Sequence, residues 1–352
     1  MASVRLFKIF GIDVKVHYSL FLILLILVWV FYIQEFPYGF RGREYALQLS
    51  VIASISLFIS VFLHELGHSL VSKRFGYNVK EIILFIFGGV AVLERQPRGL
   101  QELAVSITGP VVSLSIAGIF YLLSFSSNQI LADFSAIFFR INAIIAIFNL
   151  IPAFPLDGGR VLRGFLSRYY SPDKSTFIAS ETGKAIAIFM GVFGLFYNLW
   201  LTILAIFIYL GANEEEKMTR LESMLGRLKA RDIMTADLKT VSPYMTVGEF
   251  MEFAFKTKHL GYPVVENGEL VGMITIHDVA GKPEGILLKD LMSRDLLTVN
   301  PDTPAVEVFR LMNETGLGRI PVTENGNLVG IITKTDLVRL MQIQEVLRIG
   351  RE

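Results

Sequence analysis

Long apolar stretches fill most of the first 212 residues of this 352-residue chain. Several of them approach the roughly 20 residues that a helix needs to cross a bilayer. Hydrophobic residues make up 53% of the chain and charged residues only 18%, whereas soluble domains carry about 25% charged residues. This composition excludes a disordered chain and predicts a membrane domain.

The apolar stretches predict about six transmembrane helices. They are expected at 17–34, 46–72, 100–125 and 133–153, followed by a helical pair within 176–211. Lysine and arginine gather before the first span, after the second and after the fourth. By the positive-inside rule, both termini should be cytoplasmic in a multi-pass protein of the cell membrane.

The composition also limits the chemistry. The chain has no cysteine, which excludes a disulfide scaffold, an iron–sulfur cluster, a cysteine nucleophile and any cysteine-bound zinc. A metal must therefore bind to the five histidines or to carboxylates. The net charge is +1, so no global field recruits nucleic acid, and no nucleic-acid partner is expected.

One HExxH motif lies in the second predicted span. On a helix, His64 and His68 are four residues apart and share one face, which is the spacing of a zinc pair. Glu65 lies beside them and could take a proton from a zinc-activated water. Such groups are costly inside a span unless they serve a site or face water. The alternative is a cluster at a helix end whose side chains reach to the interface.

A catalytic zinc usually takes three protein ligands. Of the remaining histidines, His17 only begins the first span and the others lie outside the apolar spans, so the third ligand should be a carboxylate at comparable depth. Asp157 fits, because it follows the fourth span in the stretch NLIPAFPLDGGR. Alternatively, Asp157 could cap a helix or pair with Arg160. The assignment of zinc, in preference to cobalt or iron, is based on ligand type and metal availability.

An internal repeat follows the membrane domain. DIMTADLKTVSPYMTVGEF at 232–250 aligns with DLMSRDLLTVNPDTPAVEV at 290–308, and PVVENGELVGMITIHD at 263–278 aligns with PVTENGNLVGIITKTD at 321–336. Each unit predicts a strand at Thr-Val, a helix, a strand, an Asn-Gly hairpin turn, a strand and a helix. The expected domains are therefore 1–212 for the membrane part, 213–231 for a linker helix, and 232–285 and 286–345 for the repeats.

HELGH in one span and NLIPAFPLDGGR in a later one together resemble the site-2 protease family of intramembrane zinc metalloproteases. The resemblance covers about residues 1–212 and includes Gly109-Pro110 in the third span. It implies one zinc per chain, bound by His64, His68 and Asp157, with Glu65 as the catalytic acid and base. It also implies that the substrates are single-span membrane proteins cut within their transmembrane segments.

The same resemblance implies two substrate-binding regions. Asn149 would face the site and hold the substrate or the oxyanion, although it could equally form a hydrogen bond between helices. Residues 82–93 resemble a membrane-embedded β-hairpin that includes Gly88 and Gly89. A free strand edge there could pair with an unwound substrate segment. The alternative is a buried loop in which the two glycines form a turn.

The repeats resemble a pair of cystathionine-β-synthase (CBS) domains, a soluble α/β module. Such pairs often bind adenosine nucleotides such as ATP or AMP between their two units, and they often associate into homo-oligomers. This likeness points to two Thr-x-x-Asp pairs, Thr275 with Asp278 and Thr333 with Asp336. The same pattern also marks a helix start, in which these side chains only satisfy backbone groups.

The favoured function is therefore an intramembrane zinc endopeptidase whose activity an adenine nucleotide could regulate. One rival is a membrane transporter or channel gated by the CBS pair. That rival predicts inverted repeats and a polar path through the membrane midplane, whereas the polar groups of this chain gather at one depth. A second rival is a non-catalytic zinc scaffold, which would have no use for Glu65 as a base.

Overall fold

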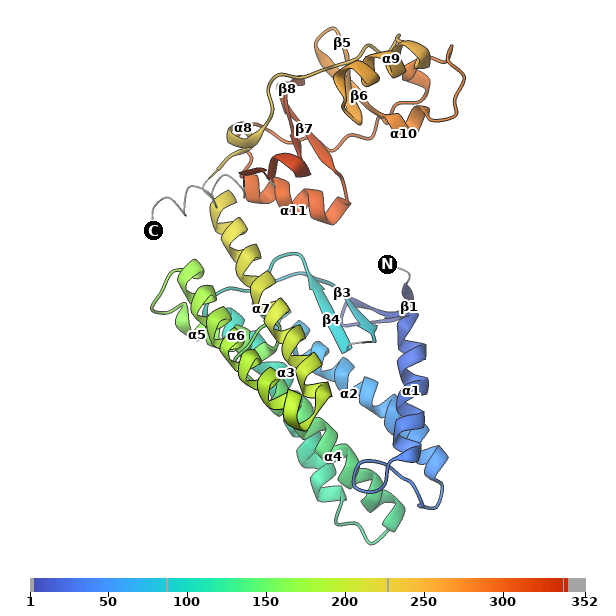
Figure 1. The fold of residues 1–352 in the computed structure, drawn as a ribbon, viewed down its shortest axis with the longest axis vertical. Helices are drawn as coiled ribbons and strands as arrows, with labels where there is room; N and C mark the ends of the chain where they lie inside the picture. Colours follow the sequence, from blue (N-terminus) through green and yellow to red (C-terminus); the bar gives the residue numbers. More distant parts are fainter. Residues whose placement is uncertain (1–2, 87, 227, 338, 341–352) are drawn as a thin grey trace. The chain divides into compact units, whose positions relative to one another are not determined.

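The computed structural model describes residues 3–86, 88–226, 228–337 and 339–340. It divides into two compact units, Met1–Thr219 and Arg220–Glu352, and each has hydrophobic clusters of its own (Figure 1). The predicted membrane and linker boundaries, 212 and 231, fall on either side of this division. The predicted domain limits stay predictions, because the linker segment 213–231 is continuous with the last apolar helix as far as Leu225.

The helices of the first unit occupy the six predicted spans and one shorter segment. They are α1 (Ser19–Ile33), α2 (Ala46–Arg74), α3 (Leu100–Leu123), α4 (Gln129–Asn149), α5 (Asp157–Leu166), α6 (Pro172–Tyr197) and α7 (Leu199–Leu225). Among the described residues, α2, α3, α4 and α6 are long and apolar enough to cross a membrane. Helix α1 is apolar but has 15 residues, and the apolar first half of α7 continues into charged sequence. The predicted multi-pass helical domain is confirmed.

One helix boundary differs from the prediction for a local reason. Helix α4 ends at Asn149 rather than at 153, because Pro152 lacks an N–H group and disfavours helix in the residue before it. The turn within the predicted helical pair at 176–211 lies at Asn198, between α6 and α7. Gly194 lets the two helices approach, since a Cβ there would lie 2.5 Å from Thr202 Oγ1.

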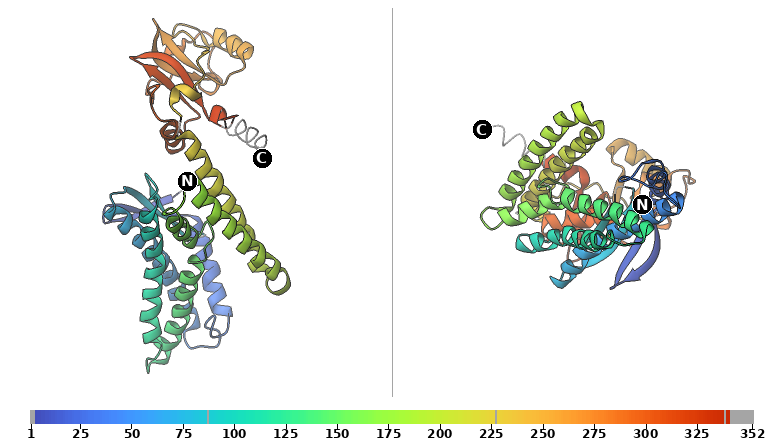
Figure 2. Two further views of the ribbon diagram at one scale, coloured as in Figure 1. Left: turned by 90° about the vertical axis from the view of Figure 1, so that its left-hand side faces the viewer. Right: turned by 90° about the horizontal axis from the view of Figure 1, so that it is seen from below.

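Helix α3 packs against α2 on one side and α4 on the other, and the three run alongside one another in both Figure 1 and Figure 2. Small residues permit this close packing in a membrane, where apolar side chains gain little by leaving lipid. A Cβ on Gly67 of α2 would lie 2.9 Å from Val112 Cγ2 of α3. The face of α2 that carries the HExxH motif is therefore held close to α3.

A four-stranded sheet lies beside these helices. Its strands are β1 (Ser3–Ile9), β2 (Ile12–His17), β3 (Val79–Phe85) and β4 (Gly88–Leu93), in the order β1-β2-β3-β4. Strands β3 and β4 form the hairpin that the resemblance implied, with Phe85 opposite Gly88. The sequence analysis did not predict β1 and β2, although IDVKVH alternates apolar and polar residues. Strand β4 ends this sheet and has an unpaired edge within the described residues.

The second unit has the predicted α/β repeat. It contains α8 (Ala230–Ile233), α9 (Val247–Thr257), β5 (Gly261–Glu266), β6 (Glu269–Thr275), α10 (Ile276–Val279), η1 (Leu288–Asp290), α11 (Ala305–Thr315), β7 (Arg319–Glu324) and β8 (Asn327–Thr333). The sheet order is β5-β6-β8-β7. The strands expected at the Thr-Val pairs are only isolated parallel bridges, from Val241 to Val264 and from Val299 to Val322.

Both hairpins of the second unit turn at the predicted Asn-Gly pairs. Asn267 and Gly268 have φ values of 53° and 91°, and Asn325 and Gly326 have 52° and 85°. Positive φ at both central residues is the geometry of the type I′ turn, which matches the twist of the flanking strands. Each repeat buries its own apolar cluster, and the cluster of the second repeat includes Leu221 and Leu225 of α7.

Candidate metal centre

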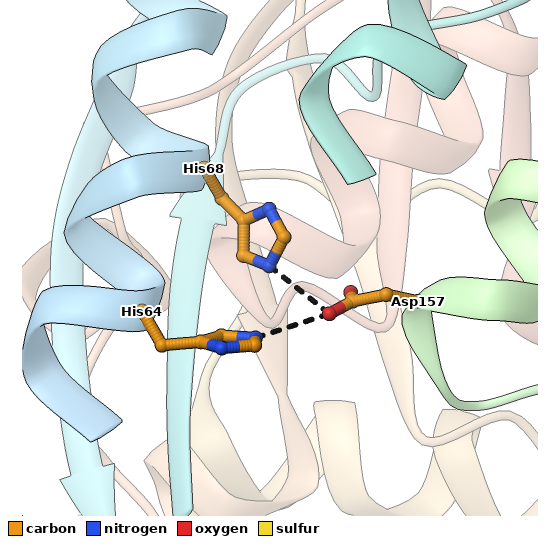
Figure 3. Close-up of side chains that lie close together, drawn as sticks. All are labelled: His64, His68 and Asp157. Carbon is orange, nitrogen blue, oxygen red and sulfur yellow. Dashed lines mark hydrogen bonds and ion pairs between the residues drawn. The ribbon is translucent and has the colours of Figure 1, made fainter. Parts of the chain in front are cut away.

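Helix α2 brings the two histidines of the HExxH motif together. His64 and His68 lie one turn apart with ring centroids 4.9 Å from each other, and 4% and 9% of their surfaces are exposed. Figure 3 shows both rings pointing from α2 toward the same carboxylate. Two imidazoles this deeply buried need polar partners, because an unpaired buried polar group is costly.

The shared carboxylate belongs to Asp157, the first residue of α5. Its Oδ2 lies 3.0 Å from His64 Nε2 and 3.2 Å from His68 Nε2. One ligand atom from each of the three residues lies within 4.8 Å of the others, and no other such group of His, Asp or Glu was found among the described residues. The structure therefore joins residues that are 93 and 89 positions apart, and Asp157 pairs with the histidines rather than with Arg160.

Helix α3 fixes the orientation of both rings from behind. His68 Nδ1 lies 2.8 Å from the carbonyl oxygen of Val105, and His64 Nδ1 lies 2.9 Å from Ser113 Oγ. A carbonyl only accepts, so His68 Nδ1 must donate, and its Nε2 faces Asp157 Oδ2. Two lone pairs at 3.2 Å repel each other unless a proton or a metal cation lies between them. Hydrogen bonds of this kind orient the histidine ligands of metals.

A glycine on α3 allows this helix to approach the imidazoles closely. A Cβ built on Gly109 would lie 2.2 Å from His68 Nε2 and 2.5 Å from His64 Nε2. Any side chain at this position would therefore occupy the volume toward which both nitrogens point. Two imidazole nitrogens and one carboxylate oxygen are a donor set that fits a tetrahedral zinc, which would keep its fourth position for water or substrate.

Glu65 lies between the metal ligands and the β-hairpin. It is half-buried, and a Cβ on Gly89 of β4 would lie 2.5 Å from Glu65 Cγ. Its neighbour Gly88 has a φ of 130°, a conformation that other residues rarely adopt. The structure thus places the backbone of the edge strand directly against the expected catalytic carboxylate. The substrate roles of Gly88 and Gly89 stay predictions.

Asn149 is the last residue of α4 and lies eight positions before Asp157. It is half-buried, and within the described part of the chain no hydrogen bond is found for its side chain. The alternative of an interhelical hydrogen bond therefore has no support in the described contacts. Its role toward substrate stays a prediction.

The predicted nucleotide residues are engaged with one another. The backbone N and the Oγ1 of Thr275 both donate to Asp278 Oδ2, at 2.8 and 2.6 Å. Thr333 donates to Asp336 Oδ2 in the same way, at 2.9 and 2.7 Å. These contacts are those of a capping box, the alternative considered from the sequence. Nucleotide binding by these four residues stays a prediction.

The sequence analysis missed the residues that support the metal ligands. Gly109 was part of the family likeness, but its place in front of the imidazoles was not foreseen. The contacts of Ser113 and of the Val105 carbonyl depend on how α3 crosses α2, so no local pattern could show them. A sequence signal was available for Glu102 of α3, which accepts a hydrogen bond from Arg163 of α5 at 2.9 Å, since an acidic residue near an apolar span needs a partner.

Models of two known families match the chain. The model described as peptidase family M50 matches residues 52–131 and 124–190, and the CBS domain model matches residues 230–285 and 288–343. A zinc metalloprotease of Methanocaldococcus jannaschii is 40% identical over 351 residues, which cover 98% of this chain and 97% of that protein. The M50 match includes both histidines and the aspartate of the metal centre.

Two solved structures are similar to parts of the chain. A site-2 protease from Methanocaldococcus jannaschii is 38% identical and covers 61% of this chain and 95% of its own, with a TM-score of 0.44. A structure described as CBSX2 in complex with AMP is 28% identical and covers 33% of this chain and 98% of its own, with a TM-score of 0.31. The identity to the full-length relative decides the assignment: the chain belongs to peptidase family M50, the site-2 proteases, and is a membrane zinc metalloprotease with a C-terminal pair of CBS domains.

Proposed function

We propose that this chain is an intramembrane zinc endopeptidase that cleaves the transmembrane segments of single-span, membrane-tethered proteins. The observation that carries the proposal is the convergence of Asp157 on His64 and His68, which lie in α2, a helix long enough to span a bilayer. Zinc bound there would supply a Lewis acid that activates water and polarises a carbonyl group. One zinc per chain is expected, because the described residues form one such cluster.

Glu65 is the proposed general base and acid. It neighbours His64 in the chain, and its side chain lies against Gly89 of the edge strand β4. In the proposed reaction, Glu65 takes the proton of the attacking water and then delivers it to the amine that leaves from the cut peptide bond. General acid–base catalysis of this kind contributes about 10²- to 10⁴-fold to a rate.

The edge of β4 is the proposed binding site for the substrate backbone. A transmembrane helix satisfies its own hydrogen bonds, so it must unwind before a protease can reach a peptide bond. An unwound segment could pair with the free edge of β4, whose Gly89 lies against Glu65. Asn149 would then hold the substrate or the developing oxyanion.

The proposed orientation places both termini and the CBS pair in the cytoplasm, with the chain in the cell membrane. The support is the distribution of lysine and arginine in the loops. Water would then reach the metal centre from the cytoplasmic side. Regulation through an adenosine nucleotide such as ATP or AMP at the CBS pair is proposed on the family likeness, and so is self-association through these domains.

The test compares purified wild-type chain with the Glu65→Gln variant on model single-span substrates, with bound zinc measured in both. We expect about one zinc in each and a fall in cleavage of about 10²- to 10⁴-fold in the variant. Leu63→Ala is a matched control, because Leu63 is an exposed residue on the same helix. Zinc in both chains with equal cleavage would exclude Glu65 as the base, and absence of zinc from the wild type would overturn the proposal.

A further inference from the structure

The short helix α5 carries a second functional group besides its metal ligand. Helix α5 begins at Asp157, and Arg163 lies six residues later, about 9 Å further along the helix axis. The Arg163 side chain is 16% exposed although it carries a charge. A buried guanidinium needs anionic partners, and the partners of Arg163 come from two other helices.

Arg163 joins α5 to α3 and α7. Its Nε donates to Glu102 Oε1 of α3 at 2.9 Å, and its Nη1 donates to Glu215 Oε1 of α7 at 2.7 Å. Nη1 also lies 3.5 Å from Thr219 Oγ1. The fixed fork of a guanidinium allows it to hold both carboxylates in one geometry, which a lysine ammonium cannot do. Three helices are thus linked through one side chain.

The same guanidinium covers the loop that leads to the metal ligand. Arg163 Cζ lies 4.8 Å from the centre of the Phe154 ring, and Phe154 is fully buried three residues before Asp157. Helix α7 also contacts this loop directly, because a Cβ on its Gly211 would lie 2.6 Å from Pro155 Cδ. The loop that carries Asp157 is therefore held between Arg163 and α7.

Helix α3 connects Arg163 to the other two metal ligands. Glu102 lies one turn before Val105, whose carbonyl accepts from His68, and the same helix carries Ser113 beside His64. The bond from Arg163 to Glu102 thus fixes α5 against the helix that orients both histidines. The relative position of Asp157 and the imidazoles depends on this bond.

Stability alone explains this cluster poorly. Burying one cation and two carboxylates costs desolvation energy that their attraction often fails to offset, whereas such clusters can fix a unique geometry. A metal site requires that geometry, because ligand atoms must meet within a few tenths of an ångström.

We propose that Arg163 is a positioning residue which holds Asp157 in register with His64 and His68, and that Glu215 makes this register depend on α7. The inference rests on the proposed zinc site. Arg163 does not touch the metal ligands in this proposal; it acts through the placement of α5 and of the loop before it.

The experiment measures zinc affinity of the purified full chain by competition with a chelator, together with kcat and KM on a model single-span substrate. Arg163→Gln should weaken zinc binding about 10- to 100-fold, as loss of outer ligand support does elsewhere. The value of kcat should fall while KM changes little. Arg163→Lys should recover part of the affinity, and Glu215→Gln should lose less than Arg163→Gln.

Two further variants keep the result interpretable. Arg163→Gln leaves Glu102 buried without its cation. The double variant Glu102→Gln/Arg163→Gln removes this unpaired buried charge and should still bind zinc weakly. Arg168→Gln is the matched control, because Arg168 is an exposed arginine just after α5, and its zinc affinity should equal that of the wild type. If the Arg163 variants fold and bind zinc as tightly as the wild type, the positioning role of Arg163 is overturned, whereas the proposed zinc site stands. A wild-type chain that binds no zinc would overturn the zinc site and this inference with it.

Discussion

The metal centre and the two Thr-Asp pairs of the CBS domains look alike in sequence but differ in structure. The metal centre was predicted from the HExxH spacing and the depth of Asp157, and the Thr-Asp pairs from the resemblance to CBS domains. In the metal centre, Asp157 meets histidines 93 and 89 positions away, and one ligand atom from each of the three residues lies within 4.8 Å of the others. In the CBS pair, Thr275 and Thr333 each bond to an aspartate three positions away.

The contrast shows which contacts point to a ligand. A helix start can satisfy a Thr-x-x-Asp pair with no partner from elsewhere, so these contacts need no nucleotide to explain them. Buried histidines and a carboxylate brought together by separate helices have no such local reason. Their burial is costly, and a cation between them offsets that cost.

The largest expected effect separates the two kinds of site directly. His64→Ala removes one of three ligands, so it should weaken zinc binding by more than the roughly 100-fold that loss of outer support can cause, and it should abolish cleavage. Without added nucleotide, Thr275→Ala should leave both unchanged. Bound zinc and proteolysis, measured side by side in the two variants, check this. Full activity in His64→Ala would show that the metal centre is no more important for cleavage than the Thr-Asp pairs.

A smaller effect on zinc affinity is expected at Gly109, where α3 approaches both imidazoles. Gly109→Ala places a methyl group within 2.2 Å of His68 Nε2, so the rings must turn away, and zinc affinity should fall by about 10- to 100-fold. Gly118 lies on the same helix with open space around it, so Gly118→Ala is the matched control and should bind zinc normally. Chelator competition on both variants measures the difference. Equal zinc affinities in the two variants would show that zinc binding does not depend on the absence of a side chain at position 109.

Substitutions in the Thr-Asp pairs should lower the stability of the second unit. Thr333→Ala removes a cap and should lower the free energy of unfolding by about 0.5–2 kcal/mol, without affecting zinc. Thr246→Ala is the control, because Thr246 forms a similar box with Glu249 but lies outside the predicted nucleotide residues. Thermal unfolding with and without added ATP or AMP compares them. A loss of nucleotide-induced stabilisation in Thr333→Ala alone would assign a ligand role to Thr333.

The smallest expected effect concerns exposed charges of the second unit. A hydrogen bond from Lys229, together with the nearby charge of Arg231, lowers the pKa of Asp302 below its usual value of 3.8. A lowered folded-state pKa adds stability above the unfolded pKa, and this stability is lost as the pH falls through the folded value. Asp302→Asn should therefore be slightly less stable than the wild type at neutral pH. Unfolding curves at neutral pH and below pH 4 should converge at the lower pH, and a constant difference would contradict the assignment.

The sequence predicted the parts of the fold that local patterns specify. Apolar length marked the helices, and the Asn-Gly pairs marked both hairpins of the CBS repeats. The HExxH spacing and the stretch NLIPAFPLDGGR pointed to His64, His68 and Asp157, which the structure brings together. Their roles as zinc ligands, and that of Glu65 as base, stay predictions.

What could not be predicted depends on how distant elements cross. The closeness of Gly109 to two imidazoles follows from the approach of α3 to α2, which no single helix encodes. The sequence suggested Arg160 as an alternative partner for Asp157, whereas the ion pairs of α5 involve Arg163, Glu102 and Glu215. The pairing of β2 with β3, which ties the β1–β2 hairpin into the sheet, joins segments separated by two helices and was missed.

The free edge of β4 has a consequence for which proteins this enzyme would cut. Pairing along a strand edge engages backbone N–H and C=O groups, which nearly every residue carries. Selection would then depend on how readily a membrane helix opens rather than on its side-chain sequence. Glycine lowers helix stability by about 1 kcal/mol relative to alanine, so segments with glycine near the cut should be preferred over uniformly leucine-rich ones. Proline also weakens a helix but lacks the N–H that a strand partner needs, so its best place would be beside the paired segment rather than within it.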